Sequence, residues 1–414
     1  MTPSRSQAIV STLPRPPRPA TTPVMFSPFT GLLFDPTKVP SVGDATSPPY
    51  DVISPDDRRN LMARSPYNVV RLLLSSPDDP TYQQAAALLH TWRAEERLVL
   101  DPTERFYLYL MDYDAPDGGR RTARGVLGAL DLIDIGDRVV GHEETMAKHR
   151  ADRLAVLTAT EANLDVIIAL SSSPDLAPLL EPTGEPRLDF TTPDGVRHRL
   201  YDITDPKRIV AISSRVGEHP VAIADGHHRY TTYLGYRKTR EVEEGAGPWG
   251  AILALVAPAE GSGLTVGPYH RLFLEFPFDP DAVADAFVVD PGPPTVPTAP
   301  GSLVVATRTT AWLLTPRREA LEALPAPWRE ASPAVARELL YPRLGMSEDS
   351  ATYVSDGAEA VAAAAGLPDG AALLVAPVSE HAIAEAGEMG VRFPQKTTYF
   401  IPKPRAGLAI RVFS

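Results

Sequence analysis

The residues of this sequence that are best suited to chemistry lie together after an apolar stretch, Val221–Ala224. An acid, a glycine, two histidines and a basic residue follow in direct succession: Asp225, Gly226, His227, His228 and Arg229. A helix that begins here presents free N–H groups and the positive end of its dipole, which suits an anion such as phosphate. The arginine adds a planar fork that matches phosphate oxygens, and histidines exchange protons near neutral pH.

Asp225 has three possible roles in this segment: it could hold Arg229 in place, ligate Mg²⁺ or accept a proton from a substrate. The alternative is structural, with Asp225 capping a helix and the histidines lying on the surface. Because five polar or glycine residues of these types occur at one strand-to-helix junction, we favour a functional site.

Two other segments also carry reactive side chains. In Ser47–Ile53, two prolines stiffen the backbone and could hold Tyr50 and Asp51 in place, although a simple turn into a helix at Pro55 explains the pattern equally well. In 142–145, a His142–Glu143 pair could supply a general base, whereas a solvated charged helix is the plainer explanation.

The elements that must position these residues alternate between strand and helix. We expect strands over 67–74, 105–113, 122–134, 164–170, 196–203, 219–224 and 250–257, with helices over 80–97, 144–162, 205–214 and 228–243. In residues 301–414 we expect βαβ-like alternation, which includes an Ala-rich helix over 357–366 and a strand over 371–376. The predicted class is α+β.

Proline content sets the expected domain boundaries, because 44 of the 414 residues are proline. Residues 1–24 are proline-rich and contain no acid, which predicts a disordered tail. We then expect a core over 25–275 and a proline-rich linker or long loop over 276–300. A smaller α/β region over 301–414 completes the chain. The sequence leaves open whether 276–300 is a hinge or a packed loop.

Composition excludes several classes of protein. The absence of cysteine removes disulfides, thiolate metal sites and cysteine nucleophiles. The formal net charge of −12 makes nucleic acid an unlikely partner. No apolar run is long enough to span a membrane and no signal segment is visible, so we expect a cytoplasmic protein. Phosphate-loop, dinucleotide-binding, nucleophile-elbow and protein-kinase motifs are absent, and Met146 stands where a zinc protease has its second histidine.

Five ordered motifs give the sequence a family resemblance. S-P-P-Y-D-V-I at 47–53, H-E-x-T at 142–145, A-D-G-H-H-R at 224–229, Y-H-R at 269–271 and Q-K-x-T-Y-F at 395–400 resemble a bacterial and archaeal family long labelled a domain of unknown function. The resemblance covers nearly all of residues 26–414. Its D-G-H-H-R segment is similar to the nucleotide site of the ParB/sulfiredoxin-like superfamily, which includes ParB CTPases, sulfiredoxin and free-serine kinases. One departure is Tyr269, where the family pattern has threonine.

The resemblance implies a ParB/sulfiredoxin-like nucleotide-binding core that uses ATP or ADP with Mg²⁺. Glu143 is the expected general base, with Asp51 in reserve, and Asp225 is the expected metal ligand. The other expected catalytic residues are Asp225 and His228; the expected nucleotide contacts are Gly226, His227, Arg229, His142, Thr145 and Lys396; the expected substrate contacts are Tyr50, Ser47, His270 and Arg271.

These residues predict a small-molecule kinase that transfers a nucleotide phosphoryl group to a hydroxyl, with free L-serine as the first candidate acceptor. The alternative is a ParB-like nucleotide-binding switch that regulates a partner without such transfer. The sequence does not distinguish ATP from ADP as donor, and it leaves the oligomeric state open.

Overall fold

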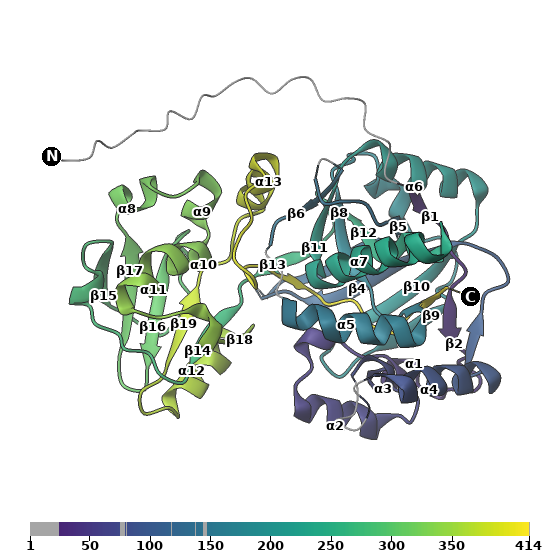
Figure 1. Ribbon diagram of the computed structural model, residues 1–414, viewed down its shortest axis with the longest axis horizontal. Helices are drawn as coiled ribbons and strands as arrows, with labels where there is room; N and C mark the ends of the chain where they lie inside the picture. The colour runs from purple at the N-terminus through teal and green to yellow at the C-terminus, as the bar shows by residue number, and fades with distance from the viewer. Residues whose placement is uncertain are drawn as a thin grey trace.

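The structure is a computed structural model that describes residues 25–74, 79, 81–116, 118–136, 138–143 and 147–413. The tail predicted over 1–24 lies outside the described residues. Two sheets, each covered by helices, form two units, and Figure 1 shows the smaller unit to the left of the larger one.

The larger unit is built on a nine-stranded mixed sheet. Its strands are β1 (Phe26–Ser27), β4 (Phe106–Asp114), β5 (Arg120–Asp131), β6 (Val139–Gly141), β8 (Ile167–Ser171), β9 (Leu188–Thr191), β10 (Arg197–Ile203), β11 (Val221–Asp225) and β12 (Ala251–Pro258). They lie in the order β6-β11-β8-β12-β5-β4-β10-β9, with β1 beside β5. The pairs β6–β11 and β8–β12 are parallel and the other described pairs are antiparallel. The β4–β5 hairpin and strands β8, β10, β11 and β12 confirm the strands expected there.

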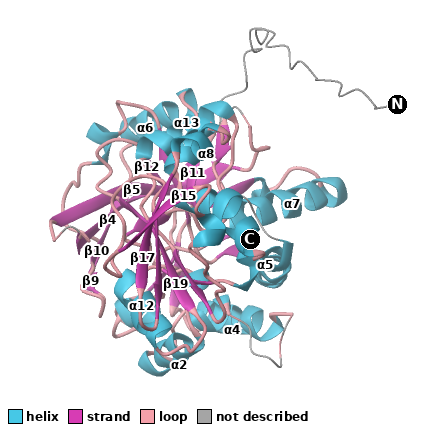
Figure 2. Cartoon of the chain, turned by 90° about the vertical axis from the view of Figure 1, so that its left-hand side faces the viewer, coloured by secondary structure: helices cyan, strands magenta, loops and turns pink. Residues whose placement is uncertain are grey.

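Helices cover both faces of this sheet, as Figure 2 shows. They are α1 (Val42–Ala45), α2 (Pro55–Arg64), α3 (Val70–Leu73), α4 (Gln83–Ala94), α5 (Ala147–Thr160), α6 (Pro206–Glu218) and α7 (His227–Glu244). Strand β4 contributes side chains to two hydrophobic cores, because successive side chains of a strand point to opposite faces of the sheet. Tyr107 and Tyr109 pack with residues of α3 and α4, whereas Leu108 and Leu110 pack with residues of α6 and α7.

The smaller unit is built on a six-stranded sheet in the order β15-β17-β16-β19-β14-β18. Its elements are β14 (His270–Phe273), β15 (Phe287–Pro291), β16 (Leu303–Thr307), β17 (Ala311–Pro316), β18 (Thr352–Val354), β19 (Ala371–Val375), α8 (Arg318–Glu322), α9 (Ala326–Glu330), α10 (Ser332–Val335), α11 (Tyr341–Leu344), α12 (Gly357–Ala365) and α13 (Glu380–Met389). Helix α12 and strand β19 confirm two expected elements.

The smaller sheet differs from the βαβ-like alternation that we expected, because its described strand pairs are all antiparallel. Residues 308–310 alone join β16 to β17. So short a connection can join antiparallel neighbours but cannot make the crossover that parallel strands need.

The boundaries between the units also differ from the expected ones. β14 already belongs to the smaller sheet, and β15 lies inside the range 276–300 that we expected to be a linker or loop. After α13 the chain returns to the larger unit, where β20 (Tyr399–Ile401) pairs with β13 (Thr265–Gly267) and β21 (Arg411–Val412) pairs with β7 (Ala162–Asn163). Figure 1 shows this returning segment in yellow. The chain therefore passes between the units twice, and the two passages lie side by side.

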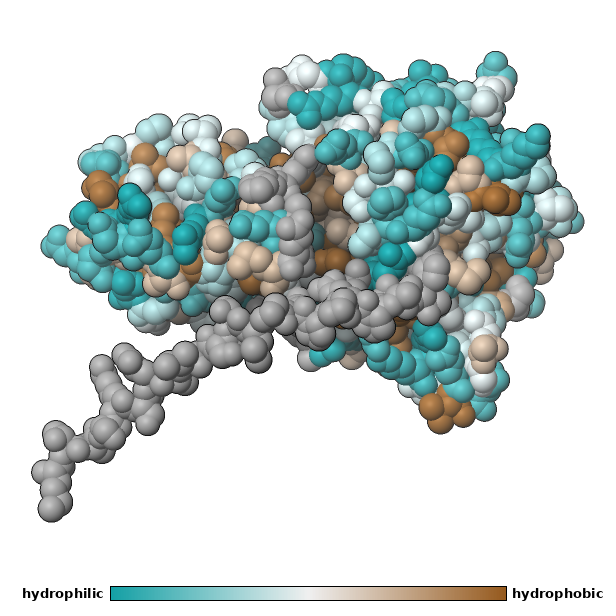
Figure 3. Space-filling view, turned by 90° about the horizontal axis from the view of Figure 1, so that it is seen from above, coloured by the Kyte–Doolittle hydropathy of each residue, from teal (hydrophilic) through white to brown (hydrophobic). Residues whose placement is uncertain are grey.

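Among the residues that the structure describes, no helix is both long enough and apolar enough to cross a bilayer. Figure 3 shows a mostly hydrophilic upper face with hydrophobic residues scattered over it.

The strand expected over 67–74 is wrong, because residues 70–73 form the short helix α3. Asn68 provides the reason. Its side-chain amide donates to Asp44 O at 2.7 Å and to Thr46 O at 3.0 Å, while its Oδ1 accepts from Val70 N at 2.9 Å. The fully buried Asn68 thereby begins a turn at the point where the apolar pattern alone indicated a strand. A small neighbouring pair, β2 (Leu32–Phe34) and β3 (Leu98–Leu100), completes this side of the unit.

Replacing Asn68 by alanine is expected to lower the free energy of unfolding by about 3 kcal/mol, because three buried backbone groups lose their partner. Urea unfolding followed by circular dichroism measures the change. Asn60→Ala, on the exposed side of α2, is the matched control and should stay within about 0.5 kcal/mol of the parent protein. Equal effects of the two substitutions would contradict the role given to Asn68.

Candidate functional site

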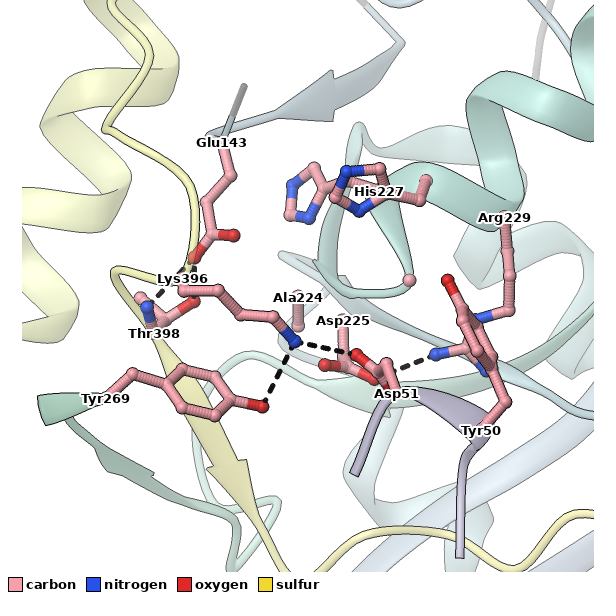
Figure 4. Close-up of a pocket in the computed structure, with 12 residues that line it drawn as sticks. Tyr50, Asp51, Glu143, Ala224, Asp225, His227, Arg229, Tyr269, Lys396 and Thr398 are labelled. Carbon is pink, nitrogen blue, oxygen red and sulfur yellow. Dashed lines mark hydrogen bonds and ion pairs between the residues drawn. The ribbon is translucent and has the colours of Figure 1, made fainter. Parts of the chain in front are cut away.

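A polar pocket lies where β6 and β11 end and the chain turns into α5 and α7. Because β6 and β11 are parallel neighbours, their carboxyl ends meet at one edge of the sheet, a common location for ligand sites in α/β proteins. Figure 4 shows the side chains that face the pocket. The lining residues are Tyr50, Asp51, Glu143, Ala224, Asp225, Gly226, His227, His228, Arg229, Tyr269, Lys396 and Thr398.

Gly226 makes the turn from β11 into α7. Its φ of 93° lies in the left-handed region, and a Cβ at this position would come within 2.6 Å of Ile167 Cγ2. Gly226 is also the N-cap of α7, and it has no side chain to satisfy the N–H groups of the first turn. The first turn therefore begins without a side-chain cap, and it carries the positive end of an 18-residue helix, which suits an anion.

Asp225 is held by two cations and does not cap α7. Lys403 Nζ donates to Asp225 Oδ1 at 2.7 Å, and Arg229 Nη2 donates to Oδ2 at 3.0 Å. The Arg229 guanidinium, 2% exposed, also forms an ion pair with Asp165 at 2.9 Å. Burial alone would raise the pKa of Asp225, but the charges of Lys403 and Arg229 hold it below its ordinary value. Asp225 is therefore ionised at neutral pH.

A second ion pair lies beside the first one in the pocket. Lys396 Nζ donates to Asp51 Oδ2 at 2.9 Å and lies 3.5 Å from the Tyr269 hydroxyl (Figure 4). Burial would raise the pKa of Asp51, but Lys396, Arg229 and Lys403 lower it below its ordinary value. Lys396 has a φ of 53°, an uncommon conformation for a residue with a Cβ, so its place in the pocket is maintained by its surroundings.

Glu143 lines the pocket and anchors the segment that returns from the smaller unit. Its Oε1 accepts hydrogen bonds from Thr397 N at 3.1 Å, Thr398 N at 2.9 Å and Thr398 Oγ1 at 2.8 Å. One oxygen of the expected general base therefore holds Thr397 and Thr398 in place, and with them the preceding residue, Lys396.

The two buried histidines are held in defined tautomers. His142 N donates to His227 Nε2 at 3.3 Å, so the ring proton of His227 is on Nδ1. Thr398 Oγ1 gives its proton to Glu143 and accepts from His142 Nε2 at 3.0 Å. Burial lowers the pKa of both histidines, and the neighbouring His142 and His228 lower the pKa of His227 further. His227 is therefore a neutral hydrogen-bond donor.

Tyr50 is fixed by stacking. The Arg153 guanidinium lies 3.9 Å from the centre of its ring, and burial raises the pKa of Tyr50 to about 12. The phenol is therefore protonated near neutral pH and can donate a hydrogen bond into the pocket.

The structure brings most of the predicted site residues together at this pocket, but Ser47 is not among the lining residues. Ser47 is buried, pairs with Ala406 through the backbone and directs its hydroxyl to Pro48 O. His142 lies directly behind the pocket, where it orients His227. The expected contact Thr145 lies outside the described residues.

His270 and Arg271 also lie away from the pocket lining, in β14 of the smaller unit. His270 Nδ1 accepts from Val375 N at 3.2 Å. The Arg271 guanidinium pairs with Glu348 at 2.7 Å and donates to Gln395 O at 3.3 Å, next to Lys396. Arg271 is thus one residue removed from a pocket side chain.

Sequence reasoning did not assign Lys403, Asp165 or Arg153 to the site. Lys403 lies 178 residues from its partner Asp225, so no local pattern indicated the contact. Asp165 is an acid directly before a strongly apolar strand, which was a usable signal. Arg153 lies in a run of charges that is typical of a solvated helix but could also face a phosphate, and its side chain is only 3% exposed.

The predicted metal role of Asp225 has little support in its donor geometry. Both Asp225 oxygens and one Asp51 oxygen already contact lysine or arginine. Over the described part of the chain, no three His, Asp or Glu residues gather in a way that could hold a metal. The donor set does not fit a Mg²⁺ ion held by this chain alone.

Removing the Glu143 carboxylate is expected to loosen the returning segment, because the backbone N–H groups of residues 397 and 398 lose their acceptor. In Glu143→Ala, hydrogen exchange of a peptide covering 393–403 should accelerate at least about tenfold. Glu143→Gln keeps a carbonyl oxygen at this position and should restore protection, and the exposed Glu243→Ala is the control. Unchanged exchange in Glu143→Ala would disprove the anchoring role.

The tautomer of His227 is directly measurable. Long-range ¹H–¹⁵N NMR should show a proton on Nδ1 and none on Nε2, because Nε2 accepts from a buried backbone N–H. The ring should stay neutral from pH 8 down to pH 6, since burial lowers its pKa below the ordinary value. A protonated ring or the Nε2–H form in this range would be inconsistent with the geometry.

Comparisons with known proteins give distant structural neighbours and one family. SbnI from Staphylococcus aureus has a TM-score of 0.38 at 11% identity, covering 68% of this chain and 85% of that one. A free serine kinase variant in complex with ADP has a TM-score of 0.36 at 12% identity, with coverages of 66% and 90%. A conserved hypothetical protein from Pyrococcus furiosus has a TM-score of 0.34 at 13% identity, with coverages of 66% and 93%. A search of the curated proteins finds no match.

The family resemblance inferred from the motifs is confirmed at the level of the family, while the likeness to ParB and sulfiredoxin stays a prediction. A family described as a protein of unknown function, DUF1015, matches residues 26–339. Since this match spans most of the chain, the protein belongs to the DUF1015 family.

Proposed function

We propose that this protein is a small-molecule kinase that transfers a phosphoryl group from ATP or ADP to a hydroxyl, with free L-serine as the first candidate acceptor. The observation that carries the proposal is a helix N-terminus without a side-chain cap that shares one pocket with Lys396, while Lys403 lies beside the pocket residue Asp225. The positive end of the α7 dipole, Lys396 and Lys403 bring positive charge to the same part of the molecule. Phosphoryl transfer requires mainly such positioning and charge stabilisation.

The phosphate end of the nucleotide is best accommodated at the start of α7. Backbone N–H groups there donate to phosphate oxygens, and His227 Nδ1–H adds a neutral donor. Arg229 is buried between Asp165 and Asp225, so its role is to hold Asp225 and the turn in place. Lys396 is on the pocket wall and can move from Asp51 to an anionic ligand.

The ion pair between Lys396 and Asp51 suits a zwitterionic acceptor. An amino acid could exchange into this pair, with its carboxylate at Lys396 and its ammonium group at Asp51, so that two charged contacts replace one. This complementarity favours a free amino acid over an uncharged alcohol.

The transfer step needs a base for the hydroxyl proton, and Glu143 is the proposed one. The hydroxyl oxygen attacks the terminal phosphorus and forms the new P–O bond as the bridging P–O bond breaks. The bonding electrons leave with ADP, or with AMP when ADP is the donor. The hydroxyl proton passes to Glu143, whose Oε1 is already fixed by three donors, and then to solvent.

The test is phosphoserine formation, followed by mass spectrometry with purified protein, serine, MgCl₂ and either ATP or ADP. Glu143→Gln keeps the acceptor for Thr397 and Thr398 but removes the base, so turnover should fall by about 10²-fold or more while nucleotide binding persists. Asp225→Ala should abolish product because it releases Lys403 and Arg229. Glu319→Gln, an exposed residue of α8, is the matched control and should turn over normally.

Two outcomes separate the alternatives. If neither donor yields phosphoserine although calorimetry shows bound nucleotide, the kinase proposal is wrong for serine and a nucleotide-binding switch becomes the better explanation. If Asp51→Asn removes turnover and Glu143→Gln does not, the general base is Asp51.

A further inference from the structure

A surface groove runs between α5 and α7, beside the candidate site. Arg150, Leu154 and Thr158 line it from α5, and Thr231, Gly235 and Thr239 line it from α7. Figure 1 shows the two helices side by side on one face of the larger unit. The groove combines an apolar side chain with hydroxyl groups, and Arg150, Arg240 and Glu243 add charges to its lining.

Helix α7 contributes residues to both the pocket and the groove. His228 lines the pocket at the start of the helix, and Thr232, Gly235 and Thr239 follow it at spacings of four, seven and eleven residues. With 3.6 residues per turn, these positions fall on one face of the helix. A ligand whose phosphates occupy the N-terminus of α7 can therefore extend along the groove without crossing the helix.

Gly235 marks the part of the groove where a ligand can come closest to the backbone. Glycine in a helix interior lowers stability relative to alanine. A Cβ at residue 235 would meet no atom within 4 Å, so packing inside this chain does not require the glycine. The missing side chain instead keeps the groove open at the third turn of α7.

The chemistry of the groove fits a nucleoside. Leu154 is 42% exposed and offers an apolar surface to a flat base, and the exposed backbone at Gly235 allows close approach. The hydroxyls of Thr231 and Thr239 can exchange hydrogen bonds with a ribose. Arg150 adds a positive charge on the facing helix.

We propose that the groove between α5 and α7 binds the nucleoside part, ribose and base, of the nucleotide whose phosphates occupy the pocket. This inference rests on the proposed function, and it specifies where the nucleotide that donates the phosphoryl group binds. It assigns the enclosed, charged pocket to the phosphates and the acceptor, and the open groove to the rest of the donor.

Gly235→Leu tests the inference, because it adds a side chain at the groove where a Cβ meets no atom within 4 Å and replaces glycine by a better helix former. Calorimetric titrations of the full chain without serine would use ATP and inorganic tripolyphosphate, which has the phosphates but no nucleoside. The Kd for ATP should rise at least about tenfold in Gly235→Leu, while that for tripolyphosphate stays unchanged. Gly250→Leu is the matched control: a Cβ there also meets nothing within 4 Å, and the residue lines neither the groove nor the pocket.

The other outcomes overturn the inference in distinguishable ways. Unchanged ATP affinity in Gly235→Leu means that the groove does not hold the nucleoside, although the kinase proposal stands. An equal loss for ATP and tripolyphosphate means that the substitution disturbs the phosphate site instead. If the parent protein binds neither probe, the proposed function fails and the groove assignment fails with it.

Discussion

The ion pairs of Asp225 are the interaction on which the site depends. Asp225 ends β11, Arg229 lies one turn into α7, and Lys403 belongs to the segment that returns from the smaller unit. Removing one partner from such a buried group leaves an uncompensated charge, which is costly in a protein interior. The end of β11, the first turn of α7 and the returning segment therefore meet at Asp225.

The chain passes between the units twice, and both passages contribute residues to this site. The outgoing passage supplies Tyr269, directly before β14, and the returning passage supplies Lys396 and Thr398. β13 and β20 pair the two passages, and Glu143 secures the returning one with three hydrogen bonds. Arg271 joins β14 to the backbone of Gln395, so the position of the smaller unit is linked to that of Lys396. The pocket is thus made from both units rather than from the large sheet alone.

Local patterns along the chain were sufficient for much of the fold. The β4–β5 hairpin, the strand β11 with α7 after it, and α12 with β19 all formed where residue periodicity and turn residues indicated. The patterns failed where a side chain far along the chain, or a buried polar group, determined the local structure. Asn68 made a helical turn out of an apolar run, and the short connection between β16 and β17 made an antiparallel pair where an α/β pattern was expected.

The sequence by itself determined the family, the strand-to-helix junction at Asp225–Arg229 and the residue types that could bind phosphate, because each depends on neighbours in the chain. Only the tertiary structure decided which of those residues share a pocket. It joined Asp225 to Lys403 across 178 residues and Asp51 to Lys396 across 345, and it placed His270 and Arg271 elsewhere. The physical reason is that buried charges are stable only beside their partners, and the identity of those partners is set by how the two units pack and not by spacing along the chain.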